Sequence, residues 1–178
     1  MAIKPTIYKF RISLSDLNRD YYDTLSLTLA QHPSETIERM MVRVLAYCIN
    51  AQEHLVFTKG LSDIDEPDLW VRTLDDQTAL WIEVGEPAVE RIKKAGHLAN
   101  DVKIYTFNSK SDVWWGQAKG KINQLKASVY KFEWDNIQAL AAMVDRTMDM
   151  SVSITGDSAY VATEQGECEV GWVVLQEK

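Results

Sequence analysis

Two apolar runs that each carry one acidic residue constrain the fold of this chain more than any other feature. They are residues 66–70, which contain Asp68, and residues 81–85, which contain Glu83. Two apolar runs around a polar stretch are typical of a β-hairpin. A two-residue turn at residues 75–76 places Asp68 opposite Glu83, whereas a four-residue loop shifts the pairing and a three-residue loop puts the two acids on different faces.

The opposed arrangement has a chemical consequence. Opposed side chains in a hairpin have Cβ atoms about 4.5–5.5 Å apart, so the carboxylates of Asp68 and Glu83 could together hold one hard cation such as Mg²⁺. The strand period of two places Trp70 and Trp81 on the same face as the two acids. The sequence therefore predicts a cation site on one face of this hairpin.

Composition places the chain in a broad class. Its 178 residues suit one domain with a substantial core. No apolar run approaches the roughly 20 residues of a membrane span, and the first residues do not resemble a secretory signal. Cys48 and Cys168 offer neither a disulfide framework nor metal-ligand spacing. We therefore expect a soluble cytoplasmic protein with two reduced thiols and no membrane partner.

Charge is unevenly distributed along the chain. The net charge of −7 argues against a protein that coats nucleic acid. Residues 109–131 are an exception, because they contain five lysines, one acid and several aromatic residues. Lysines among aromatics can bind phosphates and stack bases, although a solvated face over core tryptophans has the same composition. The candidate nucleic-acid contacts are Lys110, Lys119, Lys121 and Lys126.

Periodicity predicts a mixture of strands and helices. Residues 6–13 and 21–29 alternate as a hairpin, and Ser34 is a possible cap for an amphipathic helix that ends near Asn50. After the central hairpin, a helix at 87–98 and a strand at 102–107 imply a mixed sheet with a helical crossover. A short strand at 55–58 precedes the hairpin. The later elements are helices at 112–117, or alternatively 112–125, and at 135–146, and strands at 129–132, 148–155, 159–163 and 168–175.

One residue of the first helix lies on an unexpected side. At about 100° per residue from Ile37, Glu38 falls near 100°, inside the apolar arc that runs from Met40 to Ile49. A carboxylate at the edge of a buried face is costly unless it meets a partner, a cation or water. Glu38 is therefore a site candidate. The alternative is a solvated boundary residue favoured by the helix dipole.

The order of these elements resembles the PD-(D/E)-x-K nuclease fold, and the closer resemblance is to the YaeQ family, whose fold is similar to those nucleases. The matching blocks span most of the chain. They are residues 32–36 (HPSET), 38–41 (ERMM), 65–67 (DEP), 81–83 (WIE), 91–95 (RIKKA), 105–108 (YTFN) and 145–148 (DRTM). The resemblance implies a single domain over 1–178, with a nuclease-like core at about 33–146. It also implies a second antiparallel sheet from about 4–30 and 147–176.

The resemblance also implies a chemistry. Asp68 and Glu83 would hold Mg²⁺, and Glu38 would complete the metal shell or order a water. The nuclease pattern places a lysine two residues after the glutamate, where this chain has Gly85. Lys93 or Lys94 from the next helix could replace it, and Lys93 is predicted to lie nearer the sheet, unless both belong with Arg91 to a solvated cationic face. Secondary candidates are Ser34, Glu35, Asp65, Glu66 and Asn108.

Three functions are consistent with this pattern. The first is a metal-dependent nuclease with a displaced lysine. The second is an inactive nuclease-fold protein that binds nucleic acid or another protein, which the missing lysine and the acidic charge favour. The third is an interaction protein that docks a partner on a tryptophan-rich surface, which would include Trp70 and Trp81 if they are exposed.

Overall fold

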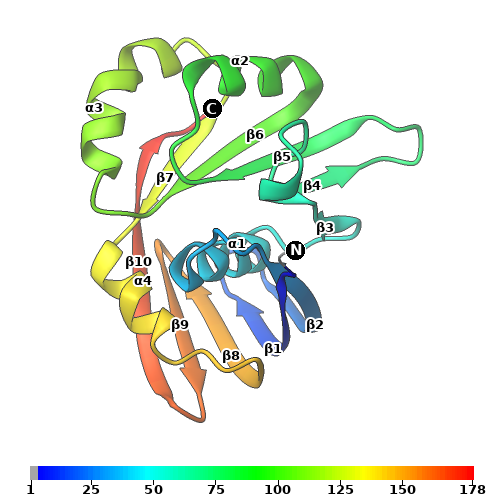
Figure 1. The fold of residues 1–178 in the computed structure, drawn as a ribbon, viewed down its shortest axis with the longest axis vertical. Coiled ribbons are helices and arrows are strands. Elements are labelled where there is room, and N and C mark those ends of the chain that lie inside the picture. The colour runs from blue at the N-terminus through cyan, green and yellow to red at the C-terminus, as the bar shows by residue number, and fades with distance from the viewer. Residues whose placement is uncertain (1–3) are drawn as a thin grey trace. The chain divides into compact units, whose positions relative to one another are not determined.

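The computed structural model describes residues 4–178 and divides into two compact units. Among the described residues, the first unit contains 4–49 and 133–172, and the second contains 50–132 and 173–178. The strands belong to one ten-stranded hydrogen-bonded sheet, so the separate second sheet expected from the chain ends is wrong (Figure 1). Strand β10 contributes its residues up to Trp172 to the first unit and its last residues to the second.

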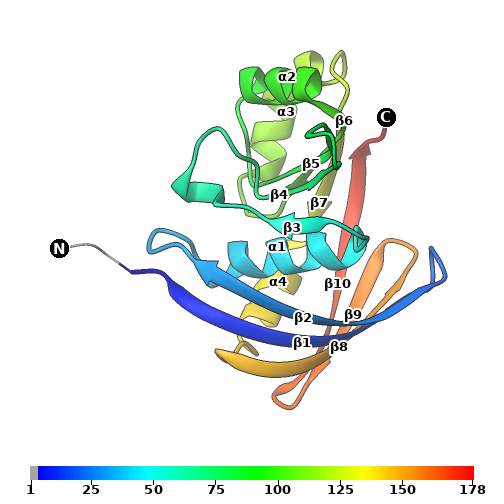
Figure 2. The same ribbon diagram turned by 90° about the vertical axis from the view of Figure 1, so that its right-hand side faces the viewer.

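The first unit combines five strands with two helices. Its strands follow the order β2-β1-β8-β9-β10, and β1 is antiparallel to β2 but parallel to β8. Helices α1 and α4 lie on one side of this sheet, and no helix of the unit covers the other side (Figure 2). The elements are β1 (Thr6–Asp16), β2 (Tyr21–Gln31), α1 (Ile37–Ile49), α4 (Trp134–Ala141), β8 (Thr147–Thr155), β9 (Ser158–Thr163) and β10 (Gly166–Gln176).

Alternation along β1 explains why one face of this sheet is covered. Phe10, Ile12 and Leu14 are buried, whereas Arg11 and Ser13 between them are exposed. Side chains of a strand point alternately to the two faces, so the apolar set meets the helices and the polar set faces solvent. The sequence pattern alone therefore decides which side of the sheet receives α1 and α4.

The second unit has a mixed sheet with helical crossovers. Strands β3, β4 and β5 pair antiparallel, whereas β5, β6 and β7 pair parallel, and the end of β10 lies beside β7. Helices α2 and α3 connect the parallel strands, as parallel pairing requires. The elements are β3 (Leu55–Phe57), the 3-10 turn η1 (Gly60–Ser62), β4 (Leu69–Arg72), β5 (Thr78–Val84), α2 (Val89–Leu98), β6 (Ala99–Thr106), α3 (Ser111–Ile122) and β7 (Ser128–Phe132).

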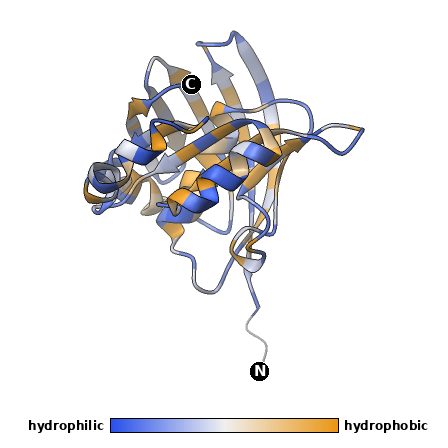
Figure 3. Cartoon of the chain, turned by 90° about the horizontal axis from the view of Figure 1, so that it is seen from above, coloured by the Kyte–Doolittle hydropathy of each residue, from blue (hydrophilic) through white to orange (hydrophobic). Residues whose placement is uncertain are grey.

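An apolar cluster fixes α2 and α3 to this sheet. Ile92 of α2 and Ile122 of α3 are buried together with Trp81, Ile104 and Val129 of the strands. Coloured by hydropathy, the helical ribbons carry both hydrophobic and hydrophilic residues (Figure 3). Since Trp81 and Glu83 share one face of β5, the helices cover the face that carries Glu83.

The mixed α/β class expected from the sequence is confirmed, with three differences of detail. The sheet from the two chain ends was expected to be antiparallel, but β1 pairs parallel with β8. The first helix begins at Ile37 because Thr36 Oγ1, and not Ser34, accepts the Arg39 N–H at 3.1 Å. The helix expected over 135–146 ends at Ala141, where three-residue backbone turns replace helical hydrogen bonds before β8.

No helix within residues 4–178 is long and apolar enough to cross a bilayer.

Core packing in the second unit can be tested with two isoleucines. Ile104 is completely buried, whereas Ile64 is 81% exposed. Replacing Ile104 by alanine should lower the free energy of unfolding by about 2–5 kcal/mol, because a buried cavity is created. The matched change Ile64→Ala should cost less than about 0.5 kcal/mol in the same urea denaturation. Equal losses would show that the β6 face is not the core of this unit.

Candidate functional site

The hairpin β4–β5 pairs in the register expected from the sequence. Leu69 lies opposite Ile82 and Trp70 opposite Trp81, and the Asp68 N–H donates to the Ile82 carbonyl at 2.9 Å. The regular pairing ends at Leu69, and the Asp68 N–H bonds to Ile82 and not to Glu83, so direct pairing of Asp68 with Glu83 is not part of the ladder. The expected two-residue turn is wrong, because the connection is longer and a bulge between Val71 and Arg72 restores the pairing.

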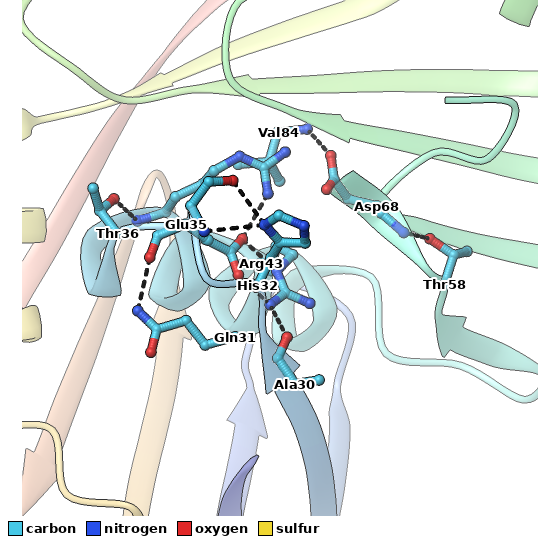
Figure 4. Close-up of polar contacts among 12 residues, drawn as sticks. Ala30, Gln31, His32, Glu35, Thr36, Arg43, Thr58, Asp68 and Val84 are labelled. Atoms are coloured by element: carbon cyan, nitrogen blue, oxygen red, sulfur yellow. Dashed lines mark hydrogen bonds and ion pairs between the residues drawn. The ribbon is translucent and has the colours of Figure 1, made fainter. Parts of the chain in front are cut away.

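Asp68 is buried where the chain enters β4. Its side chain is held by the next strand, since the Val84 N–H donates to Asp68 Oδ2 at 2.8 Å (Figure 4). Its backbone carbonyl accepts the Thr58 N–H at 3.1 Å. These bonds fix both the carboxylate and the backbone of Asp68, so this acid is held by β5 and by the residue that follows β3.

Glu83 is also buried, and the guanidinium of Arg91 lies beside it. Glu83 Oε1 accepts hydrogen bonds from Trp81 Nε1 at 3.0 Å and from Arg91 Nε at 2.9 Å. Arg91 Nη2 lies 2.9 Å from the same oxygen. Among residues 4–178, no hydrogen-bond donor reaches the second oxygen, Oε2. Glu83 therefore has one fully engaged oxygen and one that remains available.

The environment of Glu83 raises its pKa above the ordinary value of 4.5. Burial is the largest cause, because it disfavours the charged carboxylate. The hydrogen bond from Arg91 opposes this increase in the pKa, and the negative charge of Asp68 adds to it. The two acids thus repel each other in a desolvated place, which is the electrostatic condition that a cation relieves.

Arg91 also fastens the loop that precedes β4. In addition to Glu83, its guanidinium donates to the Glu66 carbonyl at 2.7 Å and to the Ile64 carbonyl. One side chain of α2 therefore joins β5 to the loop carrying Asp65 and Glu66. This arrangement makes Arg91 the positioning residue of the acidic pair.

The backbone at Gly85 explains why the nuclease-type lysine is absent. Gly85 has a φ of 111°, and its N–H donates to the Tyr105 carbonyl at 2.8 Å. An L-residue with a side chain rarely adopts this conformation. A lysine cannot occupy this position without straining the chain just after β5, so the cation near Glu83 comes from α2.

The other predicted residues of the second unit lie around the same loop and helix. Lys94 forms a surface ion pair with Asp65 at 3.6 Å, and the Lys59 N–H donates to Glu66 Oε2 at 3.0 Å. Lys93 is exposed and has no side-chain hydrogen bond or ion pair within the described residues. The structure therefore gathers Asp65 and Lys94 beside the loop fixed by Arg91, and leaves Lys93 available to a ligand.

Asn108 forms a turn, and the predicted basic segment forms α3 and its flanks. Asn108 Oδ1 accepts the Lys110 N–H at 2.8 Å. Lys119 and Lys121 are exposed on the last turn of α3, and no described residue pairs with their amines. Lys126 donates to the Ala99 carbonyl at 2.8 Å and is therefore partly engaged in structure.

Three predicted residues belong to the first unit. Glu38 is partly exposed on α1, and within residues 4–178 its side chain makes no hydrogen bond or ion pair. Glu35 is buried and joins Arg43 and Arg39, with contacts of 2.6 Å to each (Figure 4). Ser34 Oγ lies 2.7 Å from His32 Nδ1. Glu35 is thus the acid of a structural ion-pair cluster at the start of α1.

The ligand set of the acidic pair suits a hard cation. Mg²⁺ is commonly held by one or two carboxylates, with water and substrate phosphates as further ligands. Asp68 and Glu83 supply two buried carboxylates, and Glu83 Oε2 is available. Within residues 4–178, no three His, Cys, Asp or Glu side chains form a group able to hold a metal ion. A Mg²⁺ ion at this place would therefore have two carboxylate ligands from the chain and would need water or substrate for the rest.

Two hollows lie elsewhere, within the first unit. The larger has a volume of about 510 Å³ and is lined by residues of the open sheet face, including Arg11, Ser13 and Asp149. The smaller, of about 190 Å³, lies around Asp145 and Gln165. Neither is lined by a residue predicted for the site.

Comparison with known proteins decides the family. The family described as YaeQ protein matches residues 1–172. The chain belongs to the YaeQ family. It is 40% identical to the "Uncharacterized protein YaeQ" of Escherichia coli strain K12 and 39% identical to that of Salmonella typhi, over 99% of each chain.

Solved YaeQ structures share this fold. The crystal structure of YaeQ from Xanthomonas axonopodis pv. citri matches with a TM-score of 0.94 at 33% identity, covering 98% of this chain and 99% of that one. YaeQ from Pseudomonas syringae matches with a TM-score of 0.93 at 36% identity, covering 98% and 97%. The YaeQ resemblance stated from the sequence is therefore confirmed.

Sequence reasoning missed Arg91 as a site residue. It was grouped with Lys93 and Lys94 as part of a possible solvated face. The sequence held a usable signal, because Arg91 lies eight residues after Glu83 and directly before Ile92, which is buried. An arginine at that distance can reach a buried carboxylate with a planar, two-pronged donor, which a lysine lacks.

Removing Arg91 should destabilise this YaeQ chain. Arg91→Ala leaves Glu83 buried without its counter-ion, so the free energy of unfolding at pH 7 should fall by about 2–3 kcal/mol. The double change Arg91→Ala with Glu83→Gln should recover most of this loss. Urea denaturation of the two variants measures both effects. A single variant as stable as the parent would show that the ion pair does not hold the loop.

The pH dependence of the same variant gives a second test. A carboxyl whose folded-state pKa is raised contributes stability that is present below pH 4.5 and is lost as the pH rises through that folded-state pKa. Without Arg91 the pKa of Glu83 should rise further. The stability deficit of Arg91→Ala should therefore shrink as the pH is lowered from 7 towards 4.5, whereas a deficit independent of pH would assign the loss to packing.

Proposed function

We propose that this YaeQ chain hydrolyses phosphodiester bonds of nucleic acid in a metal-dependent reaction, at a variant PD-(D/E)-x-K site. The observation that carries the proposal is the burial of both Asp68 and Glu83 close enough for the charge of Asp68 to raise the pKa of Glu83, with Glu83 Oε2 available. Burying two interacting acids is costly unless a cation joins them. The nuclease-like core over about 33–146 is part of the same proposal.

Each residue has a role in this reaction. Asp68 and Glu83 would hold Mg²⁺, which when bound supplies a Lewis acid for the phosphate and lowers the pKa of a bound water. Arg91 keeps Glu83 in place. Lys93, with its free amine, would bind the phosphate oxygens, with Lys94 as the alternative. Lys110, Lys119 and Lys121 would contact the nucleic-acid backbone, assisted by Lys126.

A second function is favoured by a specific observation. Arg91 already neutralises part of the charge of Glu83, and Gly85 stands where the nuclease lysine would be. A chain with this internal counter-ion could bind nucleic acid or a protein without cutting it. Both functions place the protein in the cytoplasm, where nucleic acid is present and thiols stay reduced.

Metal binding separates the two functions. Titration of the chain with Mg²⁺ or Mn²⁺ should give binding heat, thermal stabilisation and cleavage of DNA or RNA. Asp68→Asn and Glu83→Gln should each abolish metal binding and lower cleavage at least about 100-fold, because one of two carboxylate ligands is lost. Glu53→Gln, an acid that is 89% exposed, is the matched control and should change neither.

The same titration can also refute the hydrolase proposal. If neither cation gives heat, stabilisation or cleavage, the hydrolase proposal fails. Salt-dependent nucleic-acid binding in the absence of cleavage would then support the binding function.

The basic surface of α3 can be tested independently of cleavage. Replacing both Lys119 and Lys121 by alanine should weaken nucleic-acid binding and reduce the slope of log K against log salt by about 1.5, since each phosphate contact contributes about 0.7–0.9. The exposed Lys4 and Lys9 of the first unit provide a control pair of equal charge. Equal weakening by both pairs would show that only net charge matters.

A further inference from the structure

One long strand of the first unit has no neighbour on one side. β2 is the last strand in the sheet order, so among the described residues it pairs only with β1. It has 11 residues and pairs with β1 without a bulge along its whole length. Proteins usually protect such edges with charges, prolines or bulges. β2 has no proline and one charged residue, Asp23.

Two side-chain contacts identify the backbone groups that point outward. The Thr24 N–H donates to Asp23 Oδ1 at 2.8 Å, and the Ala30 carbonyl accepts a hydrogen bond from Arg43 Nη2 at 2.9 Å. In an antiparallel pair, alternate residues direct both backbone groups to the neighbouring strand. The Thr24 N–H is bonded to Asp23 and the Ala30 carbonyl to Arg43, and not to β1. The even-numbered residues of β2 therefore direct their backbone N–H and carbonyl groups away from β1.

The segment between these two contacts exposes a balanced set of backbone groups. The outward N–H groups belong to Ser26, Thr28 and Ala30, and the outward carbonyls belong to Thr24, Ser26 and Thr28. Within residues 4–178, none of these six groups has a hydrogen-bond partner. An extended strand placed alongside would satisfy them all.

This set is complementary to itself. In an antiparallel pair of two copies centred on Leu27, Ser26 lies opposite Thr28 of the second copy, and Thr24 lies opposite Ala30. The free N–H groups then meet free carbonyls in both directions. The groups left over are the Thr24 N–H and the Ala30 carbonyl, which Asp23 and Arg43 already satisfy. A symmetric pair over residues 24–30 therefore leaves no backbone group of this segment without a hydrogen bond.

The side chains on both faces of β2 tolerate such a pair. Leu25, Leu27 and Leu29 are buried beneath the helices of their own unit. On the open face, Thr24, Ser26, Thr28 and Ala30 are small and uncharged, so two copies would meet without charge repulsion along the seam. The strand at the other end of the sheet order, β3, has only three residues and offers no comparable edge.

We propose that β2 is a self-association edge, through which two copies of this chain form a symmetric dimer by antiparallel pairing of residues 24–30. A two-fold dimer uses the same patch on both subunits, as this self-complementary set requires. The pairing is independent of the proposed hydrolase function, because none of its residues belongs to the acidic pair or to α3.

A proline substitution tests the dimer directly. Ser26→Pro removes one outward N–H and is compatible with an edge strand, whereas Ser26→Ala changes the side chain and keeps the N–H. Sedimentation velocity as a function of concentration should show a monomer–dimer equilibrium for the parent chain and for Ser26→Ala. Ser26→Pro should stay monomeric. A parent chain that is monomeric at all concentrations, or a dimer unaffected by proline, would overturn the proposal.

Amide exchange gives a readout that does not need a variant. In the dimer, the amides of Ser26, Thr28 and Ala30 should exchange slowly at high concentration and rapidly on dilution. Those of Leu25, Leu27 and Leu29, bonded to β1, should stay protected at both concentrations. Concentration-independent rapid exchange at the three even positions would contradict the pairing, even if a dimer forms elsewhere or another protein binds this edge.

Discussion

The ion pair between Glu83 and Arg91 is the interaction on which the acidic site depends. It fixes β5 to α2, and the same guanidinium holds the backbone of the loop that leads into β4. Without it, two buried and mutually repelling acids would have no internal cation beside Glu83. Because Arg91 engages only Oε1 of Glu83, it stabilises the folded chain and still leaves Oε2 available for a ligand.

Much of the fold could be predicted from local periodicity. Alternation in residues 6–29 and the spacing of apolar residues from Ile37 to Ile49 correctly predicted β1, β2 and α1, because burial of one face imposes these periods. The parallel pairing of β1 with β8 could not be predicted, since alternation is the same in both orientations. The start of the first helix was also predicted imprecisely, because Thr36 caps it and not the expected Ser34.

The site was predictable only in part. The pairing of Leu69 with Ile82 and of Trp70 with Trp81 followed from the expected register, which a bulge restored although the predicted turn was too short. Arg91 escaped notice because a charged residue next to a buried one usually faces solvent. The reason for Gly85 was also hidden, since a positive φ is a property of the folded backbone. Contacts across a fold, unlike periodicity, depend on where the elements finally pack.

The central claim is that Asp68 and Glu83 form one electrostatic unit built for a cation. Site-resolved NMR titration of the Glu83 carboxyl carbon, with and without Mg²⁺, tests it most directly. The account predicts a Glu83 pKa above 4.5 in metal-free protein, a fall in that pKa when Asp68 is replaced by Asn, and a fall when Mg²⁺ is added. A Glu83 carboxyl that titrates at or below 4.5 and responds to neither change would contradict the account.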